Sequence, residues 1–246
     1  MEKIINYIKN GKGLGLLFLL AGSVLITIMY MFVAKEIIKD FEPKVMLIAN
    51  DFLPLTVNEQ KITSPLDTYK RIEINLSDDE QSKDLFPVVL DTKNKTQDLK
   101  NEKIGLFITQ DSVILKTFND TKNLKLKDGV YDINTFKQMY TQTFGKVSLI
   151  ASIILIIGFF LSLLTRTVIT ALVGLLGVKL LKITSPIDLN YTMRLSAIII
   201  SFIDVATHIL ANFLPLNITS IHTLILGIII ELIFLNKQKN DTSNAF

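Results

Sequence analysis

The chain has 246 residues, of which 49% are apolar and 20% are charged, and its net charge is +3. It contains no Trp. It also contains no Cys, which excludes disulfides, thiolate nucleophiles, iron–sulfur clusters and Cys-ligated zinc. The basic residues are dispersed rather than interleaved with aromatic residues, so we expect no nucleic-acid partner.

The N-terminal segment, residues 1–13, holds three Lys and one Glu and precedes an uncharged run over residues 14–34. An uncharged run of about 20 residues can cross the hydrocarbon core of a bilayer as a helix. Lysines before a first span favour a cytoplasmic N-terminus, so the sequence predicts that the following segment is exported. The run is longer than the apolar core of a signal peptide, and we therefore expect a retained first transmembrane helix.

Residues 35–146 are dense in Lys, Asp and Glu, and we predict a small extracytoplasmic α/β (α+β) domain here. Helix is expected to continue to about Phe52, with a kink or break at Pro43, because proline removes a helical hydrogen bond. Pro54 is expected to end the helix and to begin extended chain that reaches Ile62.

Short apolar runs separated by polar clusters predict strands over residues 86–90, 103–109 and 113–117. The last two form the clearest hairpin, with a turn near residues 110–112. Asp128-Gly129 indicates another turn. Asn134 or Thr135 is expected to cap a helix that runs into the next span.

The C-terminal segment, residues 147–236, predicts a transmembrane bundle of three or four helices, followed by a polar tail over residues 237–246. Clear spans are expected at residues 147–165, 195–213 and 218–235. A continuous helix over residues 147–182 would measure about 54 Å, too long for one crossing. On hydrophobicity we favour a turn at Arg166 and five spans in all. Four spans remain the alternative, which places the C-terminal lysines in the cytoplasm.

The candidate intramembrane polar site consists of three ionisable residues in the predicted spans: Asp204, His208 and Glu231. Asp204 and His208 are four residues apart and share one helix face. An ionised carboxylate at the bilayer centre costs roughly 2.5–3.5 kcal/mol, so such residues usually face a bundle interior. A proton or cation pathway, or a buried site for a substrate or lipid, is one interpretation. In the other, Asp204 pairs with His208 for packing, and Glu231 reaches water.

Neither a metal site nor a catalytic site can be assembled from the sequence. His222 would have to join the carboxylates from a separate helix, and no metal-ligand spacing is present, so we expect no metal and no cofactor. Ser201 lies one turn from Asp204 but has no identifiable role as a nucleophile. An intramembrane enzyme is therefore the weakest hypothesis.

Several short sequence motifs of the chain resemble those of a known family: Leu53-Pro54-Leu55-Thr56-Val57, Val88-Val89-Leu90-Asp91-Thr92, Gly105-Leu106-Phe107-Ile108-Thr109 before Val113-Ile114-Leu115, and Leu189-Asn190-Tyr191 before Arg194-Leu195. In these motifs and in the order of its segments the chain resembles a bacterial membrane family, domain of unknown function 1189. The resemblance implies a first span, a soluble domain and then a cluster of spans, the last of them similar to Yip1-like bundles. Glu59-Gln60 departs from the family, which tends to have a glycine turn there.

The sequence therefore predicts a non-enzymatic, multi-pass α-helical protein of the bacterial inner membrane. We expect its periplasmic domain to bind a protein partner or a ligand, while the helices anchor it in the lipid bilayer. The alternative is a small transporter or lipid-handling protein that uses Asp204, His208 and Glu231.

Overall fold

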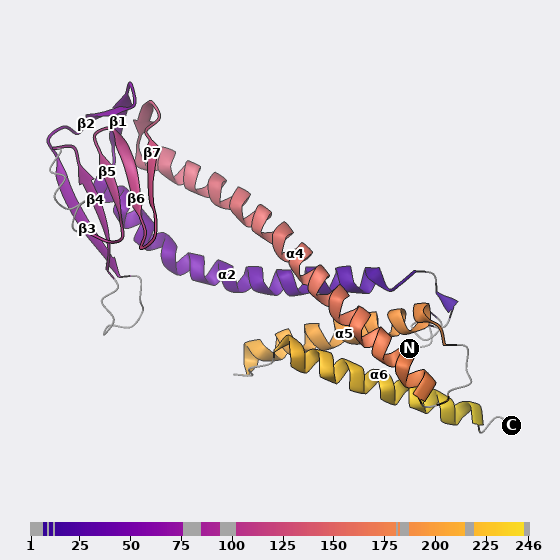
Figure 1. Cartoon of the computed structure of the whole chain (residues 1–246). Helices are drawn as coiled ribbons and strands as arrows, with labels where there is room; N and C mark the ends of the chain where they lie inside the picture. Colours follow the sequence, from indigo (N-terminus) through magenta and orange to yellow (C-terminus); the bar gives the residue numbers. More distant parts are fainter. Residues whose placement is uncertain are drawn as a thin grey trace. The chain divides into compact units, whose positions relative to one another are not determined.

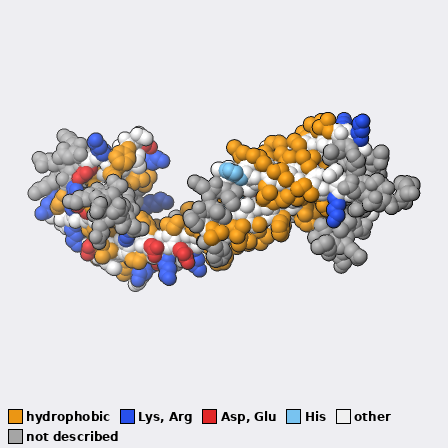
Figure 2. Space-filling view, turned by 90° about the horizontal axis from the view of Figure 1, so that it is seen from below, with side chains coloured by type: hydrophobic (Ala, Val, Ile, Leu, Met, Phe, Trp, Pro, Cys, Tyr) orange, Lys and Arg blue, Asp and Glu red, His pale blue; other side chains and the backbone are white. Residues whose placement is uncertain are grey.

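A computed structural model describes residues 7–8, 10–11, 13–75, 85–93, 102–180, 182, 187–214 and 219–243. The chain divides into two compact units. One, here called the soluble unit, is Lys35–Lys146; the other, the helical unit, combines Met1–Ala34 with Val147–Phe246. Hydrophobic side chains cover most of the visible face of the helical unit, whereas acidic and basic side chains are scattered over the soluble unit (Figure 2).

Four helices dominate the described chain: α2 (Leu16–Phe52), α4 (Ile133–Leu180), α5 (Leu189–Phe213) and α6 (Ser220–Ser243). Each contains a stretch long and apolar enough to cross a membrane. In this part of the chain the structure thus has four candidate membrane spans, and a multi-pass membrane protein is the architecture that they suggest.

Two features expected of these helices are absent. Of the kink or break expected at Pro43, the break is absent, because Pro43 lies inside the continuous helix α2. Nor does the chain turn at Arg166, because α4 runs without interruption to Leu180, so the fifth span is absent from the described residues. From Val147 to Leu180 this helix measures about 50 Å. A helix of that length crosses a bilayer by tilting or by extending beyond the hydrocarbon core.

Helix directions within the helical unit follow from paired contacts. A side chain at Gly15 would meet Ala197 and one at Gly22 would meet Ser201, so α2 and α5 run in the same direction. Gly174 and Gly177 of α4 lie against Glu231 and Leu232 of α6, so these two helices are also parallel.

The other helix pair is antiparallel, because Gly227 of α6 packs on Ile200 and Ile203 of α5 while Ser196 reaches Glu231. Successive helices therefore alternate in direction, as four consecutive spans would (Figure 1). At one end of the helical unit a buried cluster joins the end of α4, the start of α5, the end of α6 and the N-terminal segment. Its members are Ile8, Val178, Tyr191, Leu195 and Leu235.

The soluble unit contains two sheets and, between α2 and α4, no helix among its described residues. The three-stranded sheet has the order β2-β1-β8, built from β1 (Leu55–Asn58), β2 (Lys61–Ser64) and β8 (Gly129–Tyr131). The five-stranded sheet follows chain order: β3 (Tyr69–Asn75), β4 (Leu85–Asp91), β5 (Gly105–Thr109), β6 (Ser112–Lys116) and β7 (Thr121–Lys125). Neighbours are antiparallel except β4 and β5, which are parallel, so this sheet is mixed (Figure 1).

The core of the soluble unit joins both sheets to the last turns of α2. Alternate residues of the strands point inward, as the two-residue period of a strand requires. The buried cluster consists of Phe52, Leu55, Val57, Ile62, Ile74, Val88 and Leu90. At roughly 1.5–3 kcal/mol for each large buried side chain, this cluster is the main source of stability in the unit.

Several local expectations for the soluble unit are confirmed. Helix α2 ends at Phe52, and strands form where short apolar runs predict them, as β4, β5 and β6. The β5–β6 hairpin has the expected turn. By contrast, the chain from Pro54 to Ile62 is not one extended segment but the hairpin of β1 and β2.

The turn of that hairpin is formed by Glu59 and Gln60, which have φ angles of 51° and 62°. Positive φ at both central positions is typical of a type I′ turn and favours Gly or Asn. The Gln60 N–H donates to Asp128 Oδ1 at 2.7 Å, so a long-range hydrogen bond supports the turn.

The cap of α4 is Asp132, and the expectation of Asn134 or Thr135 is wrong. The helix begins at Ile133, and Asp132 Oδ1 accepts a hydrogen bond from the Thr135 N–H at 2.7 Å. That bond lowers the pKa of the fully exposed Asp132 carboxyl, because it favours the charged form.

Candidate functional site

Two polar layers cross the interior of the helical unit, and each takes one residue from α4, α5 and α6. The Arg166 layer consists of Arg166, Asp204 and Thr223. The Glu231 layer consists of Gly174, Ser196 and Glu231. On each helix the two members are eight positions apart, which is about 12 Å along the axis.

The Arg166 layer is a buried ion pair. The two terminal guanidinium nitrogens of Arg166, Nη1 and Nη2, donate to the Asp204 carboxylate, and the distance from Nη2 to Oδ2 is 2.7 Å. Nη1 also donates to Thr223 Oγ1 at 2.7 Å. The Asp204 side chain is only 2% exposed. This two-point pairing fixes the orientation of three helices and leaves the carboxylate fully engaged.

His208 does not contact the Asp204 carboxylate. Its Nδ1 lies 2.7 Å from the backbone carbonyl oxygen of Asp204, within the same helix. The imidazole packs against two aromatic rings that stack on each other, with centroids 5.8 Å from Tyr30 of α2 and 6.1 Å from Phe159 of α4. The interpretation that Asp204 and His208 pair through their side chains is therefore wrong.

The Glu231 layer has a different character. The Glu231 side chain is completely buried, so the interpretation that it reaches water is wrong in this structure. Ser196 Oγ lies 2.5 Å from Glu231 Oε2. The other carboxyl oxygen, Oε1, has no hydrogen-bond partner in the structure. A Cβ atom on Gly174 would come within 2.2 Å of Oε1, so only glycine leaves room for this carboxyl group.

Small polar side chains occupy the interior between the layers. Thr170 on α4 and Ser201 on α5 lie between them in sequence, and Thr167 adjoins Arg166. The hydroxyl oxygens of all three are buried without a partner. Buried polar groups normally have hydrogen-bond partners, so three unpartnered hydroxyl groups in one helical interior are an unusual feature of this unit.

The sequence identified the acidic members of these layers but not their partners. The sequence favours a turn at Arg166, and no pattern in it selects Ser196 or Thr223. An Arg within an apolar segment and an Asp in another segment together indicate a pair, since neither charge is stable alone in a membrane. His222 lies apart from both layers and is bonded to Thr219. Within the described residues no His, Asp and Glu cluster could hold a metal ion.

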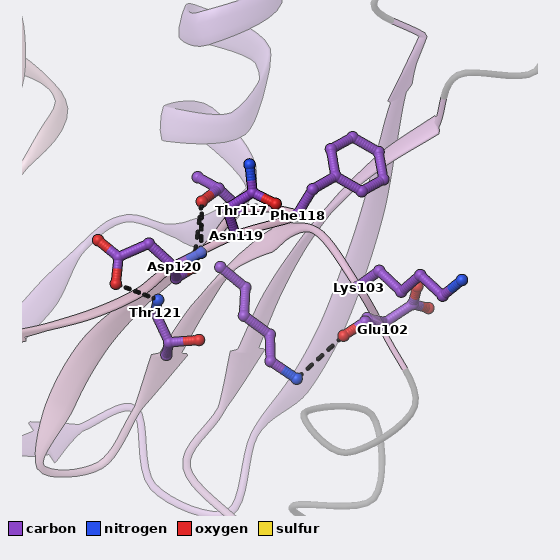
Figure 3. Close-up of a pocket in the computed structure, with 8 residues that line it drawn as sticks. Glu102, Lys103, Thr117, Phe118, Asn119, Asp120 and Thr121 are labelled. Atoms are coloured by element: carbon purple, nitrogen blue, oxygen red, sulfur yellow. Dashed lines mark hydrogen bonds between the residues drawn. The ribbon is translucent and has the colours of Figure 1, made fainter.

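The soluble unit offers a second, solvent-exposed candidate surface. An open hollow of about 550 Å³ lies beside the β6–β7 turn (Figure 3). Its walls come from Glu102, Lys103 and the segment 116–121. Thr117 and Asp120 close the turn through two hydrogen bonds, and Lys116 Nζ donates to the Glu102 carbonyl oxygen at 3.0 Å. The hollow is lined by charged and hydroxyl groups, with Phe118 the exposed apolar residue among them.

Arg71 of β3 joins two acidic residues at the same sheet. Its Nη2 donates to Glu73 Oε1 at 2.8 Å and to Glu102 Oε1 at 2.7 Å. These bonds raise the pKa of the Arg71 guanidinium above its ordinary value, chiefly through Glu102. The arrangement ties the segment before β5 to β3, which holds one wall of the hollow in place.

Comparison with protein-family models, with curated proteins and with solved structures finds no match to this chain. The resemblance to domain of unknown function 1189 therefore stays a prediction, and only the geometry of the chain supports a function for it.

Proposed function

We propose that this chain is a non-enzymatic, membrane-anchored binding protein whose soluble unit binds an extended polypeptide segment. Strand β7 is the observation that carries the proposal. All five of its residues are exposed, and in the described sheet it has a neighbour, β6, on one side only. An exposed sheet edge is a template on which an extended peptide adds as a further strand.

The backbone of β7 is arranged to accept such a strand. The Thr117 N–H donates to the Asp120 carbonyl at 2.8 Å, which closes the β6–β7 hairpin. Bonded and non-bonded pairs alternate along an antiparallel ladder, so the main-chain groups of Asn123 face away from β6. Leu124 and Phe118 are 56% and 77% exposed and supply apolar contacts beside this edge.

Charge favours an acidic partner. Residues 121–127 contain Lys122, Lys125 and Lys127 but no acidic residue. Lysines on an edge strand oppose pairing with a second copy of the same edge, because like charges would meet. They attract an acidic segment, so the proposed occupant is an extended, acidic polypeptide.

The distribution of lysines in the helical unit supports the proposed sidedness. Lys179, Lys182 and Lys237 are exposed near the end where α4 finishes, whereas the sequence that connects α5 to α6, residues 214–219, contains no charged residue. Positive residues are enriched on the cytoplasmic side of membrane proteins. We therefore propose that this end faces the cytoplasm and that the soluble unit lies outside, in the periplasm if the source is bacterial.

The proposal is tested by photo-crosslinking in native membranes. A photoreactive amino acid replaces Asn123 in the full chain, and adducts are compared between two double variants. Lys122→Glu with Lys125→Glu is expected to lower the adduct yield by at least about tenfold, since repulsion replaces attraction. Lys122→Arg with Lys125→Arg keeps the charge and is the matched control. An adduct of unchanged yield in the Glu variant contradicts the proposal.

A small transporter or lipid-handling protein is the second candidate, and the Glu231 layer favours it. The buried, unpartnered Oε1 atom is the type of group that marks transport pathways in membranes. Asp204 supports it less, because Arg166 occupies its carboxylate. Proteoliposome flux that Glu231→Gln leaves unaltered would count against this candidate.

A further inference from the structure

The Glu231 carboxyl group is buried without any compensating charge. Its side chain is completely shielded, as is that of its partner Ser196. Among the described residues no basic side chain forms an ion pair with it. An ionised carboxylate in an apolar interior is strongly unfavourable unless it is paired and fully hydrogen-bonded. Glu231 meets neither condition, since Oε1 has no partner.

The hydrogen-bond donors around Ser196 indicate which form of Glu231 fits. Ser196 Oγ lies 2.5 Å from Glu231 Oε2 and 2.8 Å from the Thr192 carbonyl oxygen. A hydroxyl group has one proton to donate. If Glu231 is ionised, Ser196 faces two acceptors and satisfies one of them. If Glu231 is the neutral acid, its O–H donates to Ser196 Oγ, and Ser196 donates to Thr192, so both contacts are made.

Among the described residues of the elements packed around Glu231, none is a charged group in contact with its carboxyl group. On α4 the adjoining residue is Gly174, and Gly177 lies against Leu232. On α5 the neighbour is Ser196, while the nearby Arg194 donates to the carbonyl oxygens of Ile8 and Gly13. The Arg166–Asp204 pair is about 12 Å away along the helices and neutralises itself.

Asp204 is the natural comparison within the same helical unit. Its carboxylate receives two donors from Arg166, an arrangement that suits the ionised form. The two intramembrane carboxyl groups thus have opposite surroundings, one with a cation and one with a hydroxyl group only. Opposed surroundings give two such groups different roles.

We propose that Glu231 is a proton-binding site, which holds one proton on its carboxyl group in the closed helical unit and releases it reversibly. In the release step the Glu231 O–H bond breaks, and the proton passes to a water molecule, which leaves a carboxylate and a hydronium ion. Six positions separate Glu231 from the exposed Lys237, about 9 Å along α6. Along α6 this is the shorter way to the surface, and it passes the buried cluster that contains Leu235.

The site is tested by infrared spectroscopy of the full chain in lipid vesicles. The carbonyl stretch of a neutral carboxylic acid absorbs at a frequency different from those of the carboxylate and amide bands. The wild-type spectrum is expected to contain this band, and Glu231→Gln is expected to abolish it. Glu36→Gln, at an exposed position on α2, is the control and leaves the band in place. As the pH rises from mildly acidic to mildly alkaline, the band should fade, and it should return when acid is restored.

Two results would overturn the proposal. If the spectrum of Glu231→Gln matches the wild-type spectrum at every pH, the carboxyl group never holds a proton. If the band is present but unchanged up to the pH at which the protein unfolds, the proton is fixed and the site does not exchange it. Far-ultraviolet circular dichroism of the same samples gives the unfolding limit.

Discussion

At the scale of single residues, the most consequential contact is the ion pair of Arg166 and Asp204. Both groups are buried, and their two-point geometry joins α4 to α5. Removing one partner of a buried pair leaves an uncompensated charge, which destabilises proteins far more than removing both.

Asp204→Asn should therefore lower the free energy of unfolding by about 3–5 kcal/mol. The double variant Arg166→Gln with Asp204→Asn should lose less than the sum of the single variants, because no charge stays unpaired. Thermal unfolding in detergent micelles measures all three. Thr165→Ala, at an exposed position on α4, is the control, and its unfolding temperature should be close to that of the wild type. Additive losses would show that the pair is not coupled.

The turn residues Glu59 and Gln60 give a second prediction, with the opposite sign. Both hold positive φ angles, which side chains other than Gly and Asn adopt at a cost. Replacing them by Asn-Gly suits a type I′ turn and should stabilise the soluble unit by about 1 kcal/mol. The backbone N–H that bonds Asp128 is kept in this variant. Denaturant midpoints of the variant and wild type should be compared, and a lower midpoint would refute the turn assignment.

At the scale of elements, close helix contact depends on glycine. Gly174 of α4 faces the Glu231 carboxyl group, whereas a Cβ on Gly158 of the same helix would meet nothing within 4 Å. Comparing these two glycines separates two effects of a Gly→Ala change, the gain in helix propensity and the loss of space.

Gly158→Ala should leave stability unchanged or raise it by up to about 1 kcal/mol, through helix propensity. Gly174→Ala should instead destabilise by roughly 1–3 kcal/mol through overpacking. In a Glu231→Ala background the Gly174→Ala penalty should shrink, because the obstructing carboxyl group is gone. Equal effects at the two glycines would mean that α4 and α6 do not pack as described. Thermal unfolding in detergent again provides the measurement.

The cap of α4 provides a pH-dependent prediction. Since hydrogen bonding to Thr135 lowers the pKa of Asp132, its stabilising effect is present above the pKa of the unfolded chain. It is lost as the pH falls through the depressed pKa of the folded state. Amide hydrogen exchange at Thr135 and Phe136 should therefore become a few-fold faster in Asp132→Ala at neutral pH. The difference in exchange rate between Asp132→Ala and the wild type should become smaller in acid. A ratio of the two exchange rates that does not change with pH would exclude a charged cap at Asp132.

At the scale of the whole molecule, the alternation of helix directions bears on the membrane topology of the chain. An even number of crossings returns the chain to the side from which it started. If the four candidate spans cross a bilayer, the lysines at the ends of α4 and α6 share one side of it, which agrees with the proposed topology.

The absence of Cys makes this topology directly measurable. Asn119→Cys, in the β6–β7 turn, and Lys237→Cys, beyond Leu235 of the buried cluster, each introduce one exposed thiol. A membrane-impermeant maleimide should label the first variant in intact cells with a permeable outer envelope, and should label the second only after lysis. Labelling of both thiols before lysis would contradict the proposed sidedness. The cysteine-free parent chain is the control.

The sequence by itself determined the features that depend on local composition. Runs of apolar residues specify membrane-compatible helices, and dispersed charge specifies a soluble segment between them, because each residue responds to its own solvent. Short apolar runs likewise specified β4, β5 and β6. The tertiary structure alone decided what long-range contacts control: Arg166 continues α4 instead of turning because Asp204 and Thr223 bind it, and the surroundings of Glu231 arise where three helices meet. Periodicity within one segment contains no information about which other segment will supply a partner.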